Sequence, residues 1–223
     1  MNLDFDYIVR IFPQILSYLP VTLFLAIVSM VCAMTLGLTL ALLRITGIKA
    51  VVKIVDLYVS IFRGIPTLVQ LFIIYFGLPQ AFPIFNGMDA FTAAIIGFSL
   101  KNSAYMAEIY RAGLTSVDFG QMEAGLSIGM QKRQIYRRII LPQAMLNTLP
   151  ATGNTFISLI KDTSVAFALG VTELFAEGKM IAAESLRYFE TFIVVGLIYW
   201  LTVLIYSRLQ TVLEKRLSQS LQR

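Results

Sequence analysis

Long apolar runs broken by very few charges constrain this chain more than any other feature. The run from Val21 to Leu43 contains no charged residue. Of the 223 residues, 57% are hydrophobic and only 14% are charged, whereas soluble domains contain roughly a quarter charged residues. The runs are too long and unbroken for one soluble core, and a spanning helix needs about 20 mostly apolar residues. The sequence therefore predicts an all-α membrane protein.

The apolar runs divide the chain into five expected transmembrane helices. Their bounds are about 20–43, 54–77, 90–110, 148–169 and 191–208, in a transmembrane domain covering 19–210. Residues 1–18 are expected to form an interfacial amphipathic segment, because apolar residues recur at helical spacing from there to the start of the first span: Phe5, Ile8, Phe12, Ile15, Leu16 and Leu19. Residues 211–223 would form a cytoplasmic tail. The segment Arg63-Gly64-Ile65-Pro66 predicts a break in the second span.

The distribution of basic residues predicts the orientation. With the N-terminus outside, the outer segments hold three bases, Arg10, Lys179 and Arg187. The inner loops and the C-terminus then hold twelve: Arg44, Lys49, Lys53, Arg111, Lys132, Arg133, Arg137, Arg138, Arg208, Lys215, Arg216 and Arg223. Cytoplasmic loops carry an excess of Lys and Arg, so we expect the N-terminus outside and the C-terminus in the cytoplasm.

The absence of histidine and the single cysteine, Cys32, exclude several classes of site. They rule out a disulfide within the chain, a Cys/His zinc site and any nucleophile paired with histidine. Cys32 lies in an apolar run, so we expect a small buried hydrophobic residue. The net charge of +5 reflects bases beside the spans rather than a nucleic-acid partner. The chain has no G-x4-G-K-[ST] motif, so we expect that it is not itself an ATPase. We also expect it to bind no metal or other cofactor, and we assign no catalytic residue.

The loop between the third and fourth spans, residues 111–142, is long for a structureless connection. Gly129 would allow a sharp turn inside it, and Pro142 would end its last helix before the next span. Apolar residues spaced four apart predict two short helices: Met122, Leu126 and Met130 in the first, Ile135 and Ile139 in the second. An amphipathic loop resting on the lipid surface is the alternative.

The residues from Glu123 to Pro142 resemble the EAA loop of inner-membrane subunits of ABC importers, E-A-A-x3-G-x9-I-x-L-P. The only departure at the named positions is Gly125 in place of the second alanine. Three further segments are similar to the polar amino-acid permease branch: Phe62-Arg63-Gly64-Ile65-Pro66 continuing to Gln70, the segment 104–111, and Lys161-Asp162-Thr163-Ser164. The last of these, with Tyr199-Trp200 and Glu173-Leu174-Phe175, looks most like the cystine-type members.

This resemblance implies a type I importer in which the loop forms a short cytoplasmic coupling helix, seated in a cleft of an ATP-binding subunit. It carries that role to Gln121, Glu123, Ala124, Gly125, Gly129 and Met130. The implied partners are a dimer of ATP-binding subunits that use ATP and Mg, a second permease (itself or a homologue), an extracellular solute-binding protein, an amino-acid substrate and membrane lipid. The implied location is the bacterial inner membrane, and the implied mechanism is alternating access.

Charged residues at membrane depth cost about 2.5 to 3.5 kcal/mol each on insertion scales, so they usually face the bundle interior. Lys101 and Glu108 are seven residues apart and project from one face of the third span. The fourth span carries a similar polar face. We expect the substrate pathway to be lined by these two faces and by Gln70: Lys161, Asp162, Thr163, Ser164, Asn154, Ser158, Lys101, Asn102, Tyr105 and Gln70.

Among these residues, Lys161 is the first candidate to bind the substrate carboxylate, and Asp162 or Glu108 could bind its ammonium. The alternative is structural: an ion pair of Lys161 with a neighbouring carboxylate, or Asp162 capping a broken helix. For Glu108, near the inner end of its span, the structural role is favoured. Lys101 would supply a second cation for a large, doubly zwitterionic substrate, or would pair within a dimer.

These observations indicate the permease subunit of an ATP-binding-cassette importer for a polar amino acid, with L-cystine as the candidate substrate, and not an enzyme. One alternative is an ion-coupled secondary amino-acid transporter that uses Glu108 and Asp162 as ion sites. Another is a membrane scaffold or an intramembrane enzyme. The chain shows no clear internal repeat, so we expect it to gain its symmetry by pairing with a second subunit.

Overall fold

The chain is helical along its described length. The computed structural model describes residues 3–221 and contains no strand within them. Arg223, assigned above to the cytoplasmic side, lies outside the described residues, as do residues 1–2 and 222. The elements are α1 (Phe5–Leu16), α2 (Leu19–Ile45), α3 (Lys49–Gly64), α4 (Thr67–Phe72), η1 (Ile73–Gly77), α5 (Leu78–Ala81), η2 (Pro83–Phe85), α6 (Ala90–Thr115), α7 (Gly120–Ser127), α8 (Lys132–Ile135), η3 (Tyr136–Ile140), α9 (Leu141–Asp162), η4 (Thr163–Leu169), α10 (Leu174–Ser185) and α11 (Tyr188–Leu221).

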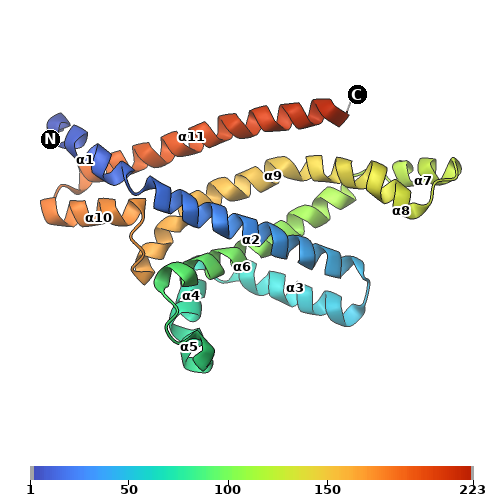
Figure 1. The fold of residues 1–223 in the computed structure, drawn as a ribbon, viewed down its shortest axis with the longest axis horizontal. Helices are drawn as coiled ribbons and strands as arrows, with labels where there is room; N and C mark the ends of the chain where they lie inside the picture. Colours follow the sequence, from blue (N-terminus) through green and yellow to red (C-terminus); the bar gives the residue numbers. More distant parts are fainter. Residues whose placement is uncertain (1–2, 222–223) are drawn as a thin grey trace.

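Three long helices form the centre of the molecule. Figure 1 shows α2, α6 and α9 running side by side, with α11 along one edge, α3 along the other, and α4 and α5 projecting away. Small residues let the central helices approach closely. A Cβ on Gly37 of α2 would lie 2.5 Å from Met106 Cβ of α6, and one on Gly113 would lie 2.3 Å from Thr148 Cγ2 of α9. Close backbone approach of this kind is common where helices pack inside a membrane.

Two stretches of the described chain are long and apolar enough to cross a membrane, 5–45 and 188–219. A third qualifies if α3 and the segment 67–81 count as one span, although they are bent by 111°. The bend occurs at the predicted break, between Gly64 and Thr67. Helices α6 and α9 contain 26 and 22 residues, but their polar residues lower their mean hydropathy.

The prediction that Pro142 ends a helix is wrong. The helix that starts at Lys132 continues through the π-helical segment η3 and into α9, with Pro142 in the first turn of α9. A proline lacks an N–H and therefore normally interrupts the hydrogen bonds of an α-helix. The π-helical turn shifts those hydrogen bonds by one residue just before the proline, so the chain passes it without a break.

The prediction that Cys32 is buried is also wrong, because its side chain is exposed on the outer face of α2. Neighbours on that helix, Phe24, Ile27 and Val31, are exposed as well. In a helix that is apolar on every side, composition does not reveal which face meets other helices and which meets the surroundings.

One element between the fourth and fifth predicted spans was not predicted. Helix α10 begins after Glu173, whose carboxylate is fully buried. That carboxylate accepts hydrogen bonds from the Ala176 amide at 3.0 Å, the Thr22 hydroxyl at 3.1 Å and the Tyr199 hydroxyl at 2.8 Å. The three donors compensate the cost of burying a charge, and they tie α2, α10 and α11 together.

Helix α1 packs on the same end of the molecule. Tyr7, Ile11 and Ile15 are buried against α10 and α11. Asp4 caps α1 by accepting a hydrogen bond from the Tyr7 amide at 2.9 Å, and it forms an ion pair with Arg187. These two contacts hold the pKa of the Asp4 carboxyl below its ordinary value.

Candidate functional site

The centre of the candidate site is an ion pair between α6 and α9. Lys101 Nζ lies 2.5 Å from Asp162 Oδ2, and the two side chains are 14% and 33% exposed. The structure thus joins two residues expected in the pathway and pairs Asp162 with Lys101 rather than with Lys161. A cation and a carboxylate that neutralise each other lower the cost of placing both at membrane depth.

A polar stripe runs along one face of α9. We call Asn147, Asn154, Ser158 and Lys161 the α9 stripe; all four side chains are exposed and recur at helical spacing. Lys161 forms no ion pair within residues 3–219, so its ammonium is available to a ligand.

The other expected pathway residues make local contacts. Gln70 is buried, and its Nε2 donates to the carbonyls of Phe62 at 3.0 Å and Ile65 at 2.7 Å, which braces the bend after α3. The buried Asn102 donates to the Phe98 carbonyl at 2.8 Å. The hydroxyls of Thr163 and Ser164 donate to the carbonyls at the end of α9. These polar groups are therefore bonded to backbone carbonyls of nearby residues in the chain.

An open cleft of about 730 Å³ lies between α6 and α9, on the side of the ion pair nearer to α7. Its lining includes Tyr105, Glu108 and Arg111 from α6 and Asn147 from the α9 stripe. Arg63, from the end of α3, also lines it, and the centre of its guanidinium lies 5.5 Å from the centroid of the Tyr105 ring.

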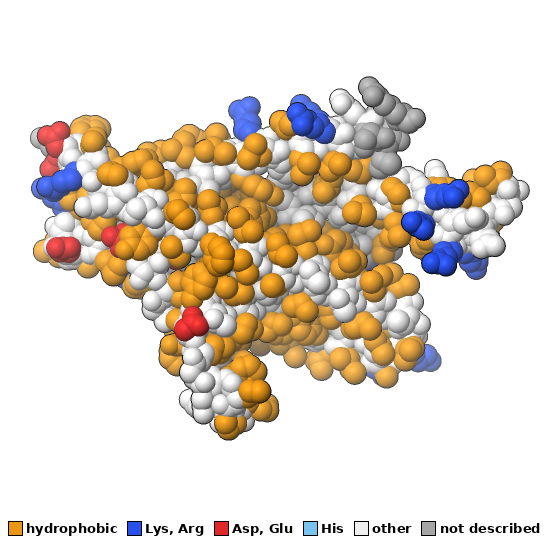
Figure 2. All heavy atoms as spheres, in the orientation of Figure 1, with side chains coloured by type: hydrophobic (Ala, Val, Ile, Leu, Met, Phe, Trp, Pro, Cys, Tyr) orange, Lys and Arg blue, Asp and Glu red, His pale blue; other side chains and the backbone are white. Residues whose placement is uncertain are grey.

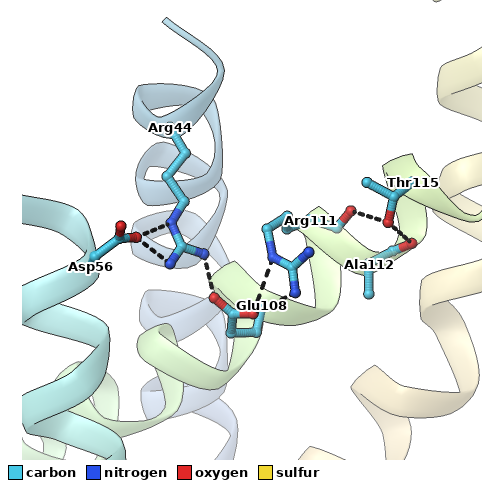
Figure 3. A network of polar contacts seen from close by, with 6 residues as sticks. All are labelled: Arg44, Asp56, Glu108, Arg111, Ala112 and Thr115. Atoms are coloured by element: carbon cyan, nitrogen blue, oxygen red, sulfur yellow. Dashed lines mark hydrogen bonds and ion pairs between the residues drawn. The ribbon is translucent and has the colours of Figure 1, made fainter. Parts of the chain in front are cut away.

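An ion-pair network closes one wall of this cleft (Figure 3). Arg44 of α2 lies between the carboxylates of Asp56 and Glu108, and Arg111 donates to the second oxygen of Glu108 at 2.8 Å. The network links α2, α3 and α6. Because both Glu108 oxygens accept from arginines, the geometry supports the structural role expected for Glu108 over binding of a substrate ammonium.

The expected coupling segment forms a helix–turn–helix. Helix α7 ends in a Schellman motif, in which the Met130 amide donates to the Gly125 carbonyl and the Gly129 amide to the Leu126 carbonyl, both at 3.0 Å. Gly129 has a φ of +82°, a conformation that glycine adopts without steric cost.

Gly125 occupies the position where the E-A-A motif has its second alanine, and the packing around it explains the glycine. Gly125 is buried, and an added Cβ would lie 2.7 Å from Cγ1 and 2.8 Å from Cδ1 of Ile135, which is fully buried. Glycine at this position therefore lets α7 pack directly on α8.

The other expected coupling residues lie on the outside of α7 and in the turn that follows it. Gln121, Glu123, Ala124 and Gly129 are exposed, and Met130 is half-buried. Phe119 and Ile128, 73% and 78% exposed, flank them and were not predicted. The signal that the sequence offered was the presence of large apolar residues in a polar loop, since such residues, when exposed, indicate a docking surface.

Within the described residues, no group of three or more His, Cys, Asp or Glu side chains could hold a metal ion.

Comparison with known proteins identifies the family. The sequence model of the family described as binding-protein-dependent transport system inner membrane component matches residues 4–219. The chain belongs to this family. A relative, the probable amino-acid permease protein YxeN of Bacillus subtilis (strain 168), is 56% identical over 98% of this chain and 97% of its own length. The L-cystine transport system permease protein TcyL of the same organism is 39% identical over 99% of this chain and 92% of its own.

A solved structure agrees with this assignment. The crystal structure of an amino acid ABC transporter with histidines matches with a TM-score of 0.89 at 37% identity, covering 97% of this chain and 100% of that one. The resemblance drawn from the Glu123–Pro142 motif is confirmed: the chain is an ABC transporter permease, a transport component. The interpretation as an ion-coupled secondary transporter gains no support from these matches. The roles expected for individual residues stay predictions.

Proposed function

We propose that this permease is the membrane subunit of an ATP-driven importer of polar amino acids that works by alternating access. The observation that carries the proposal is one continuous helix. From Lys132 to Asp162, α8, η3 and α9 follow one another without a break, so a push on the coupling segment reaches the α9 stripe directly. A rigid helix of this kind can convert closure of the ATP-binding subunits into movement of the substrate pathway.

The proposed topology has five spans, with the N-terminus outside and the C-terminus in the cytoplasm. Helices α6 and α9 are long enough to serve as spans beside the more apolar ones. Figure 2 supports the orientation: acidic side chains gather at the end that carries α1 and α10, and Lys and Arg mark the opposite end. Residues 1–18 would lie in the outer interface, 19–210 would form the transmembrane domain with the coupling loop 111–142, and 211–223 would lie on the cytoplasmic side.

The proposed complex lies in the bacterial inner membrane. It contains two permeases, identical or homologous, and two ATP-binding subunits that hydrolyse ATP with Mg. An extracellular solute-binding protein delivers the substrate. On this chain, the surface for the ATP-binding subunit is the exposed face of α7 with Phe119 and Ile128, which presents apolar side chains beside Gln121 and Glu123.

The proposed substrate carries a carboxylate and an ammonium. Lys161 is the cation open to the carboxylate, because Asp162 already holds Lys101. Binding of the ammonium by Asp162 would require that pair to open. L-cystine is the first substrate to test, since a relative at 39% identity is named for it and the Lys161–Ser164 segment is similar to cystine-type members.

The test is ATP-dependent uptake by the complex reconstituted in liposomes, with a panel of amino acids that includes L-cystine. We expect uptake of at least one polar amino acid in the wild type and none in Lys161→Ala, with the complex still assembled. Lys53→Ala, an exposed lysine at the start of α3, is the matched control and should retain uptake. Uptake that persists without ATP and collapses with an ion gradient would reject the proposal.

A further inference from the structure

Arg63 carries the uncompensated charge of the cleft between α6 and α9. It has no carboxylate within ion-pair distance in the described part of the chain, residues 3–219. The other two arginines of this region, Arg44 and Arg111, are matched by the carboxylates of Asp56 and Glu108. Two guanidinium groups against two carboxylates leave the network neutral. The cleft therefore keeps one excess positive charge, on Arg63.

The structure fixes the backbone on both sides of Arg63 and places an aromatic ring beside its guanidinium. Gln70 Nε2 donates to the carbonyls of Phe62 and Ile65, on both sides of Arg63, so the backbone at the bend is fixed. The Tyr105 ring supports the guanidinium at 5.5 Å. A guanidinium has five N–H donors, and those turned away from the ring are free to donate to a carboxylate.

Arg63 lies beside the route that a substrate would follow along the polar faces of α6 and α9. Tyr105 lies one turn from Lys101 on α6, in the direction of Glu108 and the coupling segment. On the opposite wall, the α9 stripe leads from Lys161 to Asn147, which lines the same cleft as Arg63. A ligand that leaves Lys161 and moves towards α7 would meet Arg63 next.

We propose that Arg63 is a second binding site for the substrate carboxylate, located in this cleft between Lys161 and the coupling segment. This inference rests on the proposed import of amino acids. Arg63 binds the carboxylate through the N–H edge of its guanidinium, and Tyr105 is a positioning residue that holds that edge towards the cleft. A phospholipid headgroup offers a similar anionic group, and the test separates the two sources.

The test measures binding to the purified complex of permease and ATP-binding subunits, without the solute-binding protein. The probes are the amino acid that gives the highest ATP-dependent uptake and its carboxamide, which has the same side chain and no carboxylate charge. We expect the wild type to prefer the acid. In Arg63→Gln, affinity for the acid should fall by about tenfold, as for loss of a charge-assisted hydrogen bond, while affinity for the amide stays unchanged. Arg63→Lys should recover part of the preference.

Arg10 offers a matched control, since its guanidinium lies 5.6 Å from the centroid of the Tyr7 ring, on α1 and away from the cleft. Arg10→Gln should keep the wild-type preference for the acid. Equal preference in wild type and Arg63→Gln would overturn the inference while the proposed function stands. So would an effect of Arg63→Gln seen only in bilayers with anionic lipid, which would assign the site to a headgroup. Absence of ATP-dependent uptake by the wild type would overturn both.

Discussion

Asp162 shows how a single side chain acquires its role from a neighbour in space. In the sequence it follows Lys161, and the spacing along the fourth span placed both on one polar face. In the structure its partner is Lys101, on another helix. Asp162 is therefore paired, whereas its chain neighbour Lys161 is exposed and forms no ion pair within residues 3–219.

The Lys101–Asp162 pair predicts a strong coupling in a double-mutant cycle. Lys101→Met or Asp162→Asn alone leaves a partly enclosed polar group without its partner. Each should lower the stability of the complex by about 2 kcal/mol, between the values for exposed and buried pairs. The double variant should recover most of that loss. Thermal unfolding of the purified complex measures the cycle, and costs that simply add would contradict the pair.

Gly125 predicts a second effect at the residue scale. Gly125→Ala would push a methyl group against Ile135, and overpacking of this kind costs about 1 to 3 kcal/mol. We expect reduced transport-coupled ATP hydrolysis, because α7 must shift on α8. In an Ile135→Ala background the same change should cost little, since the clashing atoms are gone. Gly196→Ala, a glycine with nothing within 4 Å of its added Cβ, is the control.

At the scale of elements, α1 is attached to α10 and α11 by a polar end and an apolar face. Besides the Asp4 ion pair, the Tyr7 hydroxyl lies 2.6 Å from Ser185 Oγ and 3.1 Å from Thr191 Oγ1. Apolar contacts are not directional, so the apolar face of α1 alone would not fix how the helix is oriented on α10 and α11. The polar contacts at its N-terminal end therefore set that orientation.

The lowered pKa of Asp4 predicts that docking of α1 depends on pH. A carboxyl with a folded-state pKa below its unfolded value, about 3.9 for Asp, contributes its full stability above that value and loses it as the pH falls towards the folded pKa. Hydrogen exchange of the α1 amides, corrected for intrinsic rates, should show protection falling as the pH is lowered below about 4. Asp4→Asn keeps a capping oxygen but cannot ionise, so it should show a weaker pH dependence. An unchanged profile would rule out this role.

At the scale of the whole molecule, the two ends differ in charge, and an apolar belt separates them (Figure 2). Acidic residues gather near α1 and α10, whereas bases mark α8 and the end of α11. This separation matters for the proposed function because the solute-binding protein would deliver substrate at one end and the ATP-binding subunit would bind at the other. Helix α9 and its stripe connect the two.

The proposed orientation predicts which ends react with a membrane-impermeant thiol reagent in intact cells. In a Cys32→Ser background, a cysteine at Glu184, exposed on α10, should be labelled without permeabilisation. A cysteine at Ser127, exposed on α7, should be labelled only after permeabilisation. The reverse pattern would show that the chain has the opposite orientation.

The sequence by itself determined the features that depend on local spacing. Apolar runs predicted an all-helical membrane protein, the Glu123–Pro142 pattern identified an importer permease, and Gly129 marked the turn of the coupling segment. Each of these follows from the order of residues within about 20 positions, the length of one span.

The tertiary structure alone decided which faces meet. It paired Lys101 with Asp162, buried Glu173 under three donors, exposed Cys32 and carried the helix past Pro142. The ion pair and the burial of Glu173 join residues far apart in the chain, so local spacing does not predict them. For Cys32 on α2, the physical reason is that lipid is as apolar as the protein interior. A helix with apolar residues on every side therefore carries no periodic signal of its contact face, and only packing against distant helices selects it.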